Sequence, residues 1–222
     1  MDELRTSIND SNHSVGPTNS QTYEDTTVAI VKRKVVIVGI AGVGKSTVVN
    51  KLVELMAQNG AKVNVVNYGT VMMEEATRIF GVKSRDDMRK LPVEKQRDLQ
   101  VYAASKISKI QDEFVVVDTH LFIATKEGYW PGMPMDVLQA LKPSHLVLVT
   151  ASLEEIKKRR ETDTTRVRDK STIESLSIEI DAARSFLFAS GLICGCPALI
   201  VYNSDGMVEE TAKRIINSVF TN

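Results

Sequence analysis

The sequence predicts an α/β fold, in which helices cover both faces of a mainly parallel β-sheet. Short apolar runs alternate along the chain with segments whose apolar residues recur at helical spacing. Strands separated by helices need crossover connections, and such connections make neighbouring strands parallel. The predicted strands are residues 34–38, 62–66, 114–118, 146–150 and 198–202.

The first predicted strand, residues 34–38, is apolar after its lysine and ends at Gly39, as expected of a strand buried on both faces. A helix is predicted directly after it, because Val49, Leu52 and Met56 recur at helical spacing before a glycine ends the segment. Similar spacing predicts helices within residues 99–110, after residue 152 and within residues 208–219. This alternation is the pattern that crossover connections require.

The composition is that of an ordinary soluble domain. The 222 residues suit one domain with a sizeable core, and 28 basic residues balance 28 acidic ones, so no net charge attracts nucleic acid or a membrane. No apolar run is long enough to span a bilayer. The only cysteines, Cys194 and Cys196, are too close in sequence for a disulfide framework. We therefore predict a cytoplasmic protein without nucleic-acid or membrane partners.

The first 32 residues differ from the rest of the chain. Residues 6–27 contain twelve Ser, Thr or Asn residues among 22, with very few aliphatic side chains. Such a segment buries too little apolar surface to offset the entropy lost on ordering. We predict a disordered polar tail over residues 1–32, or a segment foreign to the natural protein, followed by a folded domain over residues 33–222.

Residues 39–46, here called the phosphate loop, match G-x-x-x-x-G-K-[ST] and continue with Thr47. They follow a predicted strand and open a predicted helix, which is the context that this motif needs. The glycines let successive backbone N–H groups point at phosphates, and the helix N-terminus adds favourable partial charge. We expect Lys45 to contact the β- and γ-phosphates and Ser46 to bind Mg²⁺. The loop predicts binding of a nucleoside triphosphate.

Kinases, ATPases and switch GTPases share this loop, so other segments must distinguish them. A switch GTPase normally recognises guanine through Asn-Lys-x-Asp after a late strand. This chain has Asn203-Ser204-Asp205-Gly206 there, without the lysine. A motor-type ATPase is usually longer. A small kinase is the remaining interpretation.

A small kinase needs basic groups around the transferred phosphoryl group, and residues 157–168 contain six basic residues in twelve positions. Arginines bind phosphate bidentately and neutralise the charge of the transition state. The polar centre of this segment predicts a flap that closes and excludes water. We expect Lys157 and Lys158 on a solvated helix face, and functional roles for Arg166 and Arg168.

An aspartate ends the strand at residues 114–118, where the carboxyl edge of a parallel sheet binds ligands. Asp118 is therefore a candidate to bind Mg²⁺ directly or through water, and the alternative is that it caps the next element. His120 either contacts the acceptor phosphate or satisfies a local hydrogen bond.

Several ordered segments resemble one family, the archaeal-type adenylate kinases. They are VNYGTVMMEEA at 66–76, RDDMRKL at 85–91, VVVDTH at 115–120, KEGYWPGMP at 126–134, RRETDTTRVRD at 159–169 and YNSDG at 202–206. With the phosphate loop they extend over nearly all of the chain after residue 32. Their combination and order are more specific than the loop alone.

The resemblance implies a three-layer P-loop NTPase fold with a five-stranded parallel sheet. It implies an AMP-binding region at about residues 67–112 and a small mobile lid at about residues 159–172. The implied reaction is the reversible, Mg²⁺-dependent transfer of the terminal phosphoryl group of ATP to AMP, giving two ADP. The implied assembly is a homotrimer.

The resemblance also implies roles for individual residues. Those expected to hold the donor nucleotide are Gly39, Ala41, Gly42, Val43, Gly44, Lys45, Ser46 and Thr47, with Asn203 beside the adenine. Those expected to act in catalysis are Lys45, Arg160, Arg166 and Arg168. Those expected to hold AMP are Thr70, Arg89, His120 and Arg184. Ser46 and Asp118 are expected to hold Mg²⁺.

The chain departs from the family pattern at two positions. Ser204 stands where the family often has arginine, and Ala183 where it often has asparagine. Two other functions are open on the residues alone. One is a small kinase with another nucleotide or a metabolite as acceptor, and the other is a nucleotide-dependent binding protein without turnover.

Overall fold

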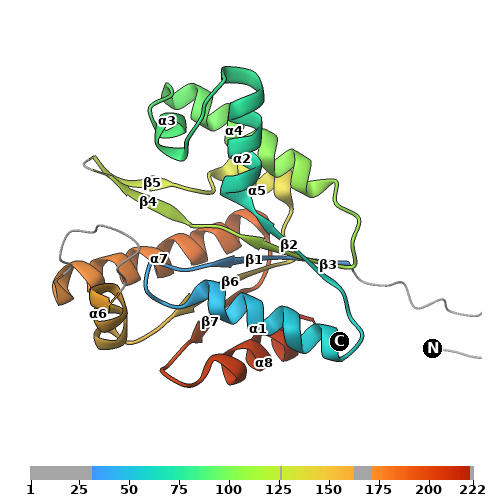
Figure 1. Ribbon diagram of the computed structural model, residues 1–222, viewed down its shortest axis with the longest axis vertical. Helices are drawn as coiled ribbons and strands as arrows, with labels where there is room; N and C mark the ends of the chain where they lie inside the picture. Colours follow the sequence, from blue (N-terminus) through green and yellow to red (C-terminus); the bar gives the residue numbers. More distant parts are fainter. Residues whose placement is uncertain (1–31, 126, 163–171, 221–222) are drawn as a thin grey trace, which may run out of the picture. The chain divides into compact units, whose positions relative to one another are not determined.

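A five-stranded parallel sheet forms the centre of the computed structural model, which describes residues 32–125, 127–162 and 172–220 (Figure 1). The strands lie in the spatial order β2 (Val63–Asn67), β3 (Phe114–Asp118), β1 (Arg33–Val38), β6 (His145–Thr150) and β7 (Ala198–Tyr202). All neighbouring pairs are parallel. The predicted sheet is confirmed, and its strand limits agree with the predicted ones to within one residue.

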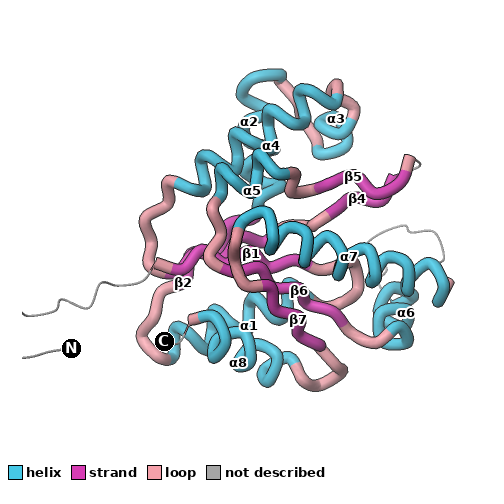
Figure 2. Tube along the Cα trace, turned by 180° about the vertical axis from the view of Figure 1, so that it is seen from behind, coloured by secondary structure: helices cyan, strands magenta, loops and turns pink. Residues whose placement is uncertain are grey.

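Helices cover both faces of this sheet, so the predicted three layers are confirmed (Figure 2). The alternating residues of β1 show the two faces. Val35 and Ile37 pack in a core with α1 and α8, whereas Val36 and Val38 pack in a core with α2, α4, α5 and part of α7. The helices of the two layers are α1 (Lys45–Gln58), α8 (Val208–Val219), α2 (Tyr68–Phe80), α4 (Val93–Ser108), α5 (Met135–Leu141) and α7 (Ile173–Cys194).

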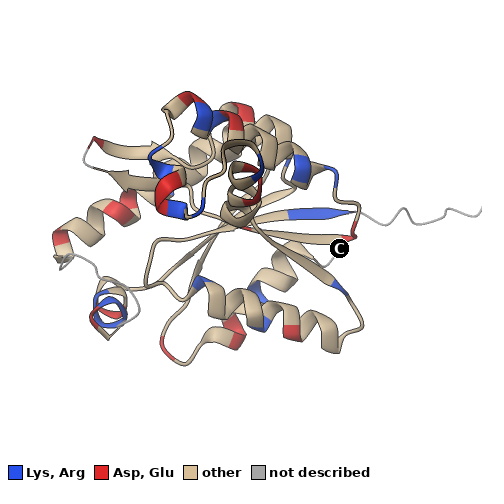
Figure 3. Ribbon diagram, turned by 45° about the horizontal axis from the view of Figure 1, so that its top comes forward, with Lys and Arg blue, Asp and Glu red and all other residues tan. Residues whose placement is uncertain are grey.

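Helices α2, α3 (Arg85–Arg89) and α4 form a region with a small core of its own. Ala76, Val82, Met88 and Leu99 are its buried residues. Charged residues of both signs lie on the helices of this region, and the central strands carry few (Figure 3). This region falls within the predicted acceptor-binding segment, residues 67–112.

A two-stranded antiparallel hairpin, β4 (Phe122–Thr125) with β5 (Gly128–Pro131), lies beside the main sheet. The sequence pattern indicated no strand there, because each strand is only four residues long and β4 is mostly exposed. Phe122 anchors the hairpin through ring contacts with Tyr129 and with Phe186 of α7. The contact of Phe122 with α7 therefore stabilises the hairpin, and the sequence pattern does not reveal this contact.

Some sequence-based expectations fall outside the described residues. They are the predicted tail up to residue 31 and residues 163–171 of the predicted lid, with Arg166 and Arg168. Helix α6 (Leu153–Thr162) leads into the lid segment and α7 begins after it. Among the helices that the structure describes, none combines the length and the apolar character needed to cross a membrane.

Candidate active site

The phosphate loop connects β1 to α1 at the carboxyl edge of the sheet. Gly42 and Gly44 have φ angles of 91° and 78°, in the left-handed region that glycine adopts without strain. Gly44 also starts α1, since its carbonyl oxygen accepts the Val48 N–H at 3.1 Å. The loop therefore presents the N-terminus of a 14-residue helix, where free N–H groups and the helix dipole favour phosphate.

Side chains from distant segments hold the carbonyl groups of this loop. Asn203 Nδ2 donates to the Val43 carbonyl oxygen at 2.8 Å, and Arg160 Nε donates to the Ala41 carbonyl oxygen at 2.8 Å. The Val43 side chain is fully buried in the core. Carbonyl oxygens repel phosphate oxygens. Because Asn203 and Arg160 bind two of the carbonyl oxygens of the loop, the N–H groups of the loop remain available to a phosphate ligand.

Lys45 and Asp118 meet beside the loop in an ion pair. Asp118 ends β3, and Ile37 is its register partner in β1, so the sheet brings the carboxylate next to the start of α1. The Lys45 side chain is 9% exposed, and this burial lowers its pKa to about 8. Lys45 therefore remains mainly protonated at neutral pH, as a group that binds phosphate must be.

Mg²⁺ fits the residues at this edge. The described residues contain no cluster of three His, Cys, Asp or Glu side chains that would bind a metal alone. Nucleotide-bound Mg²⁺ needs no such cluster, because one or two protein oxygens suffice beside phosphate oxygens and waters. The exposed Ser46 in the first turn of α1 and the Asp118 carboxylate are oxygen ligands of the kind that Mg²⁺ prefers.

An open pocket of about 490 Å³ lies on α2 and α3. Its lining residues are Thr70, Met73, Glu74, Thr77 and Arg85. Thr70 was predicted as an acceptor-binding residue, whereas Arg85 was not singled out. The pocket combines one cationic, one apolar and two hydroxyl side chains with Glu74, whose carboxylate pairs with Lys106 at 3.2 Å, so Arg85 and the hydroxyl groups can bind a phosphate beside an apolar contact for a base.

A continuous chain of polar contacts connects this pocket to the phosphate loop, and Asn67 is its centre. Asn67 Nδ2 donates to Asp118 Oδ2 at 3.1 Å. Asn67 Oδ1 accepts the Thr70 N–H at 3.0 Å and Arg85 Nη2 at 3.3 Å. Arg85 Nη2 also donates to Thr70 Oγ1 at 3.1 Å. The ion pair of Asp118 with Lys45 completes the chain, so the pocket and the loop belong to one polar site.

The structure does not bring Arg89 into the pocket. Arg89 lies in the last turn of α3 and its Nη1 pairs with Asp86 Oδ1 at 2.7 Å. Ser84 caps α3 by accepting the Asp87 N–H at 3.1 Å. Ser84 followed three residues later by Asp87 is a capping signal readable in the sequence, and it would have placed Arg85 at the start of this helix.

The other predicted residues have identifiable partners. His120 Nδ1 lies 3.2 Å from the carbonyl oxygen of Gly39, the first residue of the phosphate loop. Arg160 binds Glu179 of α7 through both terminal nitrogens, at 3.2 and 2.7 Å. Arg184 donates to the Tyr202 hydroxyl at 2.9 Å and is not among the residues that line the pocket.

Two solved structures with a similar backbone are shikimate kinases. A shikimate kinase from Acinetobacter baumannii, solved with shikimate, gives a TM-score of 0.51 at 16% identity and covers 84% of this chain and 92% of its own. A shikimate kinase from Bacteroides thetaiotaomicron gives a TM-score of 0.52 at 13% identity, with 84% and 97% covered. At these identities the likeness concerns the fold alone.

Sequence comparison identifies the family. The adenylate kinase of Methanocaldococcus jannaschii is 40% identical over 183 residues, which cover 82% of this chain and 95% of that protein. Those of Thermoplasma acidophilum and Sulfurisphaera tokodaii are each 38% identical, with 83% of this chain and 97% of each relative covered. A family described as "AAA domain" also matches residues 38–177. The chain belongs to the adenylate kinase family of these archaeal proteins.

Proposed function

We propose that this chain is a cytoplasmic enzyme that transfers the terminal phosphoryl group of ATP to AMP, reversibly and with Mg²⁺, giving two ADP. The observation that carries the proposal is the polar chain from Lys45 through Asp118 and Asn67 to Thr70 and Arg85. It joins a triphosphate-binding loop to a second pocket at one sheet edge. The two free cysteines, Cys194 and Cys196, agree with a reducing compartment.

On the donor side, the N–H groups of the phosphate loop and the Lys45 ammonium group bind the phosphates of ATP. Ser46 and Asp118 would hold Mg²⁺, which would supply positive charge beside the phosphate oxygens. With a triphosphate and its cation bound, phosphate would be the new partner of the Lys45 amine, and the Asp118 carboxylate would hold the cation directly or through water. The buried pair thus keeps both groups in place before the nucleotide binds.

On the acceptor side, Arg85 and Thr70 bind the phosphate of AMP, and Met73 and Thr77 lie against its base. Arg89, His120 and Arg184 remain proposed AMP contacts, implied by the resemblance, that need closure of the site. AMP has an oxygen that is already deprotonated near neutral pH, so neither Asp118 nor His120 needs to act as a base. Alignment of this oxygen with the terminal phosphorus and charge stabilisation are the main requirements.

The proposed lid, residues 159–172, closes over the transferred group. Arg160, Arg166 and Arg168 stabilise the charge that develops on the phosphoryl oxygens and exclude water, which would otherwise hydrolyse ATP. In the described geometry Arg160 is bound to Glu179. Contact between Arg160 and a phosphate therefore requires it to exchange this partner during closure.

We also propose the homotrimer that the family resemblance implies. Exposed apolar side chains near the end of α7 support an assembled state, since Leu192 is 86% exposed and Phe188 and Ile193 are also exposed. Sedimentation of the full chain tests this directly. A Leu192→Glu variant that sediments as a smaller species supports the assignment of the surface, and an unchanged trimer contradicts it.

A panel assay tests the reaction. ADP formation is measured with MgATP and each of several nucleoside monophosphates, and with shikimate, whose kinases share the fold. We expect AMP to be the preferred acceptor. Folded protein that binds ATP but forms no ADP with AMP contradicts the proposal, and turnover with another acceptor identifies a different kinase on the same fold.

A further inference from the structure

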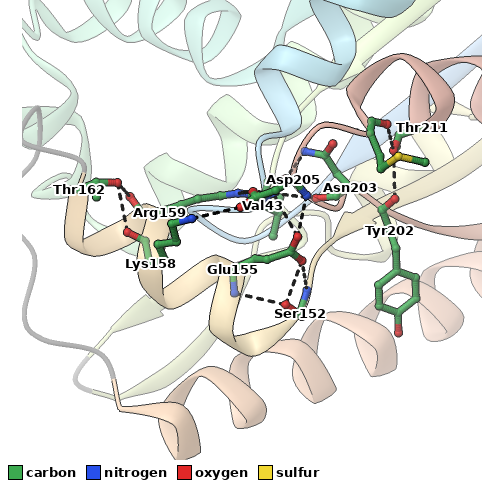
Figure 4. Close-up of polar contacts among 11 residues, drawn as sticks. Val43, Ser152, Glu155, Lys158, Arg159, Thr162, Tyr202, Asn203, Asp205 and Thr211 are labelled. Atoms are coloured by element: carbon green, nitrogen blue, oxygen red, sulfur yellow. Dashed lines mark hydrogen bonds and ion pairs between the residues drawn. The ribbon is translucent and has the colours of Figure 1, made fainter.

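Asn203 is the first residue after β7, and its side chain is only 2% exposed. Its backbone N–H donates to the Thr150 carbonyl oxygen at 2.7 Å, which extends the pairing of β7 with β6. Its side-chain Nδ2 donates to the Val43 carbonyl oxygen at 2.8 Å (Figure 4). The amide group therefore faces the phosphate loop and is enclosed by protein, which is not the arrangement of a side chain that reads a nucleotide base.

The contact with the loop is close. A Cβ atom added to Gly44 would lie 2.5 Å from Asn203 Nδ2, so the absence of a side chain at Gly44 provides the space that the amide occupies. In a planar trans peptide the carbonyl oxygen of Val43 and the N–H of Gly44 point in opposite directions. By binding that oxygen, Asn203 sets the direction of the Gly44 N–H, which points away from the bound oxygen.

Arg159 holds Asn203 and the loop together from α6 (Figure 4). Its Nη2 donates to the Asn203 carbonyl oxygen at 3.0 Å, and its Nη1 lies 3.4 Å from the Val43 carbonyl oxygen. Its Nε donates to Asp205 Oδ1 at 3.1 Å, and the Asp205 N–H donates to Glu155 Oε1 at 2.6 Å. The segment after β7 is therefore bonded to α6, the helix that leads into the proposed lid.

We propose that Asn203 is a positioning residue for the phosphate loop, which acts through the Val43–Gly44 peptide on the affinity for phosphate and makes no contact with adenine. This inference rests on the proposed function, because it assumes that the loop binds a donor triphosphate. It replaces the adenine contact that the family resemblance implied for this residue. If Asn203 has a positioning role, its substitution should lower the affinity for every triphosphate by the same factor, whatever the base.

The test compares the binding of inorganic tripolyphosphate, ATP and GTP by calorimetry, at constant Mg²⁺, to the full chain and to Asn203→Asp. The aspartate has the same shape but presents a carboxylate oxygen to the Val43 carbonyl. We expect all three affinities to fall together by roughly 10- to 100-fold, because the Val43 carbonyl loses the shorter of its two hydrogen bonds and faces a carboxylate oxygen that repels it. The ratio of ATP affinity to GTP affinity should change by less than about twofold.

Asn59→Asp is the matched control. Asn59 Nδ2 also donates to a backbone carbonyl, that of Leu55 at 3.0 Å, but at the opposite end of α1 and on the surface. Its substitution should leave tripolyphosphate affinity unchanged. If Asn203→Asp does not fold, as judged by circular dichroism, the uncharged Asn203→Ala takes its place with the same expected pattern.

The outcomes separate the two proposals. Wild-type affinity for tripolyphosphate in the folded Asn203 variant, or a changed ATP-to-GTP ratio with unchanged tripolyphosphate affinity, overturns the positioning role alone. If the wild-type chain binds no triphosphate, the proposed function fails and this inference fails with it. A variant that unfolds at lower temperature but binds tripolyphosphate normally shows a purely structural role and also overturns the inference.

Discussion

The two halves of the site are built in opposite ways. On the donor side, side chains from α6 and from the segment after β7 hold the phosphate loop, and Lys45 is paired with Asp118 at the end of β3. On the acceptor side, Thr70 and Arg85 line an open pocket on helices that have only a small core of their own. The proposed donor half is therefore held by side chains from several elements, whereas the pocket of the proposed acceptor half is open and has room to close around a ligand.

Because the two halves differ in this way, we expect substitutions in them to change different kinetic constants. A change in the donor half removes charge stabilisation from the transition state and should lower turnover. A change in the open half removes binding of the acceptor and should raise its KM. The polar chain through Asn67 is the physical connection between the halves, because its amide contacts both Asp118 and Thr70.

The largest effect is expected from Lys45→Met, which keeps most of the buried stem and removes the charge. Turnover should fall by about 10³-fold, because Lys45 is the first residue of α1 and, without its ammonium group, the charge on the transferred group loses its partner. The steady-state rate of ADP formation measures this fall in turnover. Lys51→Met is the control on the same helix, where Lys51 forms a surface pair with Glu54 and its loss should change turnover by less than about twofold. Near-normal turnover by folded Lys45→Met would refute the assigned role.

Arg85→Ala should weaken the binding of AMP without weakening the binding of ATP. We expect the KM for AMP to rise by roughly 10- to 100-fold, which corresponds to the loss of a charged hydrogen bond, with the KM for ATP unchanged. Initial rates at varied AMP and saturating ATP measure this. Arg97→Ala, an exposed arginine of the neighbouring helix α4, serves as the matched control. An unchanged KM for AMP would remove Arg85 from the pocket assignment.

The pKa of Lys45 predicts a pH dependence confined to the donor half. Burial lowers this pKa to about 8 in the free protein, so the amine is charged below that pH and neutral above it. Binding of a triphosphate above pH 8 must therefore take up a proton, and affinity should fall by up to about tenfold per pH unit. Calorimetric titration of tripolyphosphate from pH 7 to 9.5 measures the slope. Lys45→Met should show no such slope, and a slope that persists in this variant would assign the titration to another group.

The sequence predicted the donor half better than the acceptor half, for a physical reason. The phosphate loop is a local structure whose backbone angles are encoded by Gly42 and Gly44, and Asp118 could be placed because a strand end has a known position at a sheet edge. The five strands were predictable because each is a short apolar run between helical segments. These features need no knowledge of how distant segments meet.

The remaining features depend on tertiary contacts that the sequence pattern does not contain. Arg85 and Arg89 belong to one short helix, and only the cap at Ser84 distinguishes which of them lies at its start. The position of Asn203 against Gly44 depends on how β7 packs beside the loop. The β4–β5 hairpin was missed because its strands are short and exposed, so its stability comes from contacts with α7.

Of these substitutions, Arg89→Ala should have the smallest effect on the KM for AMP. In the described geometry Arg89 is 61% exposed and pairs with Asp86, and it contacts AMP only after the proposed closure, so its loss should raise the KM for AMP less than the loss of Arg85 does, by less than about threefold. The double variant with Arg85→Ala extends the test. If the two effects on the KM add as free energies, the two arginines act independently of each other. If Arg89→Ala alone raises the KM as much as Arg85→Ala does, closure must bring Arg89 to AMP, as the family resemblance implies, and the open half then rearranges more than the donor half on binding.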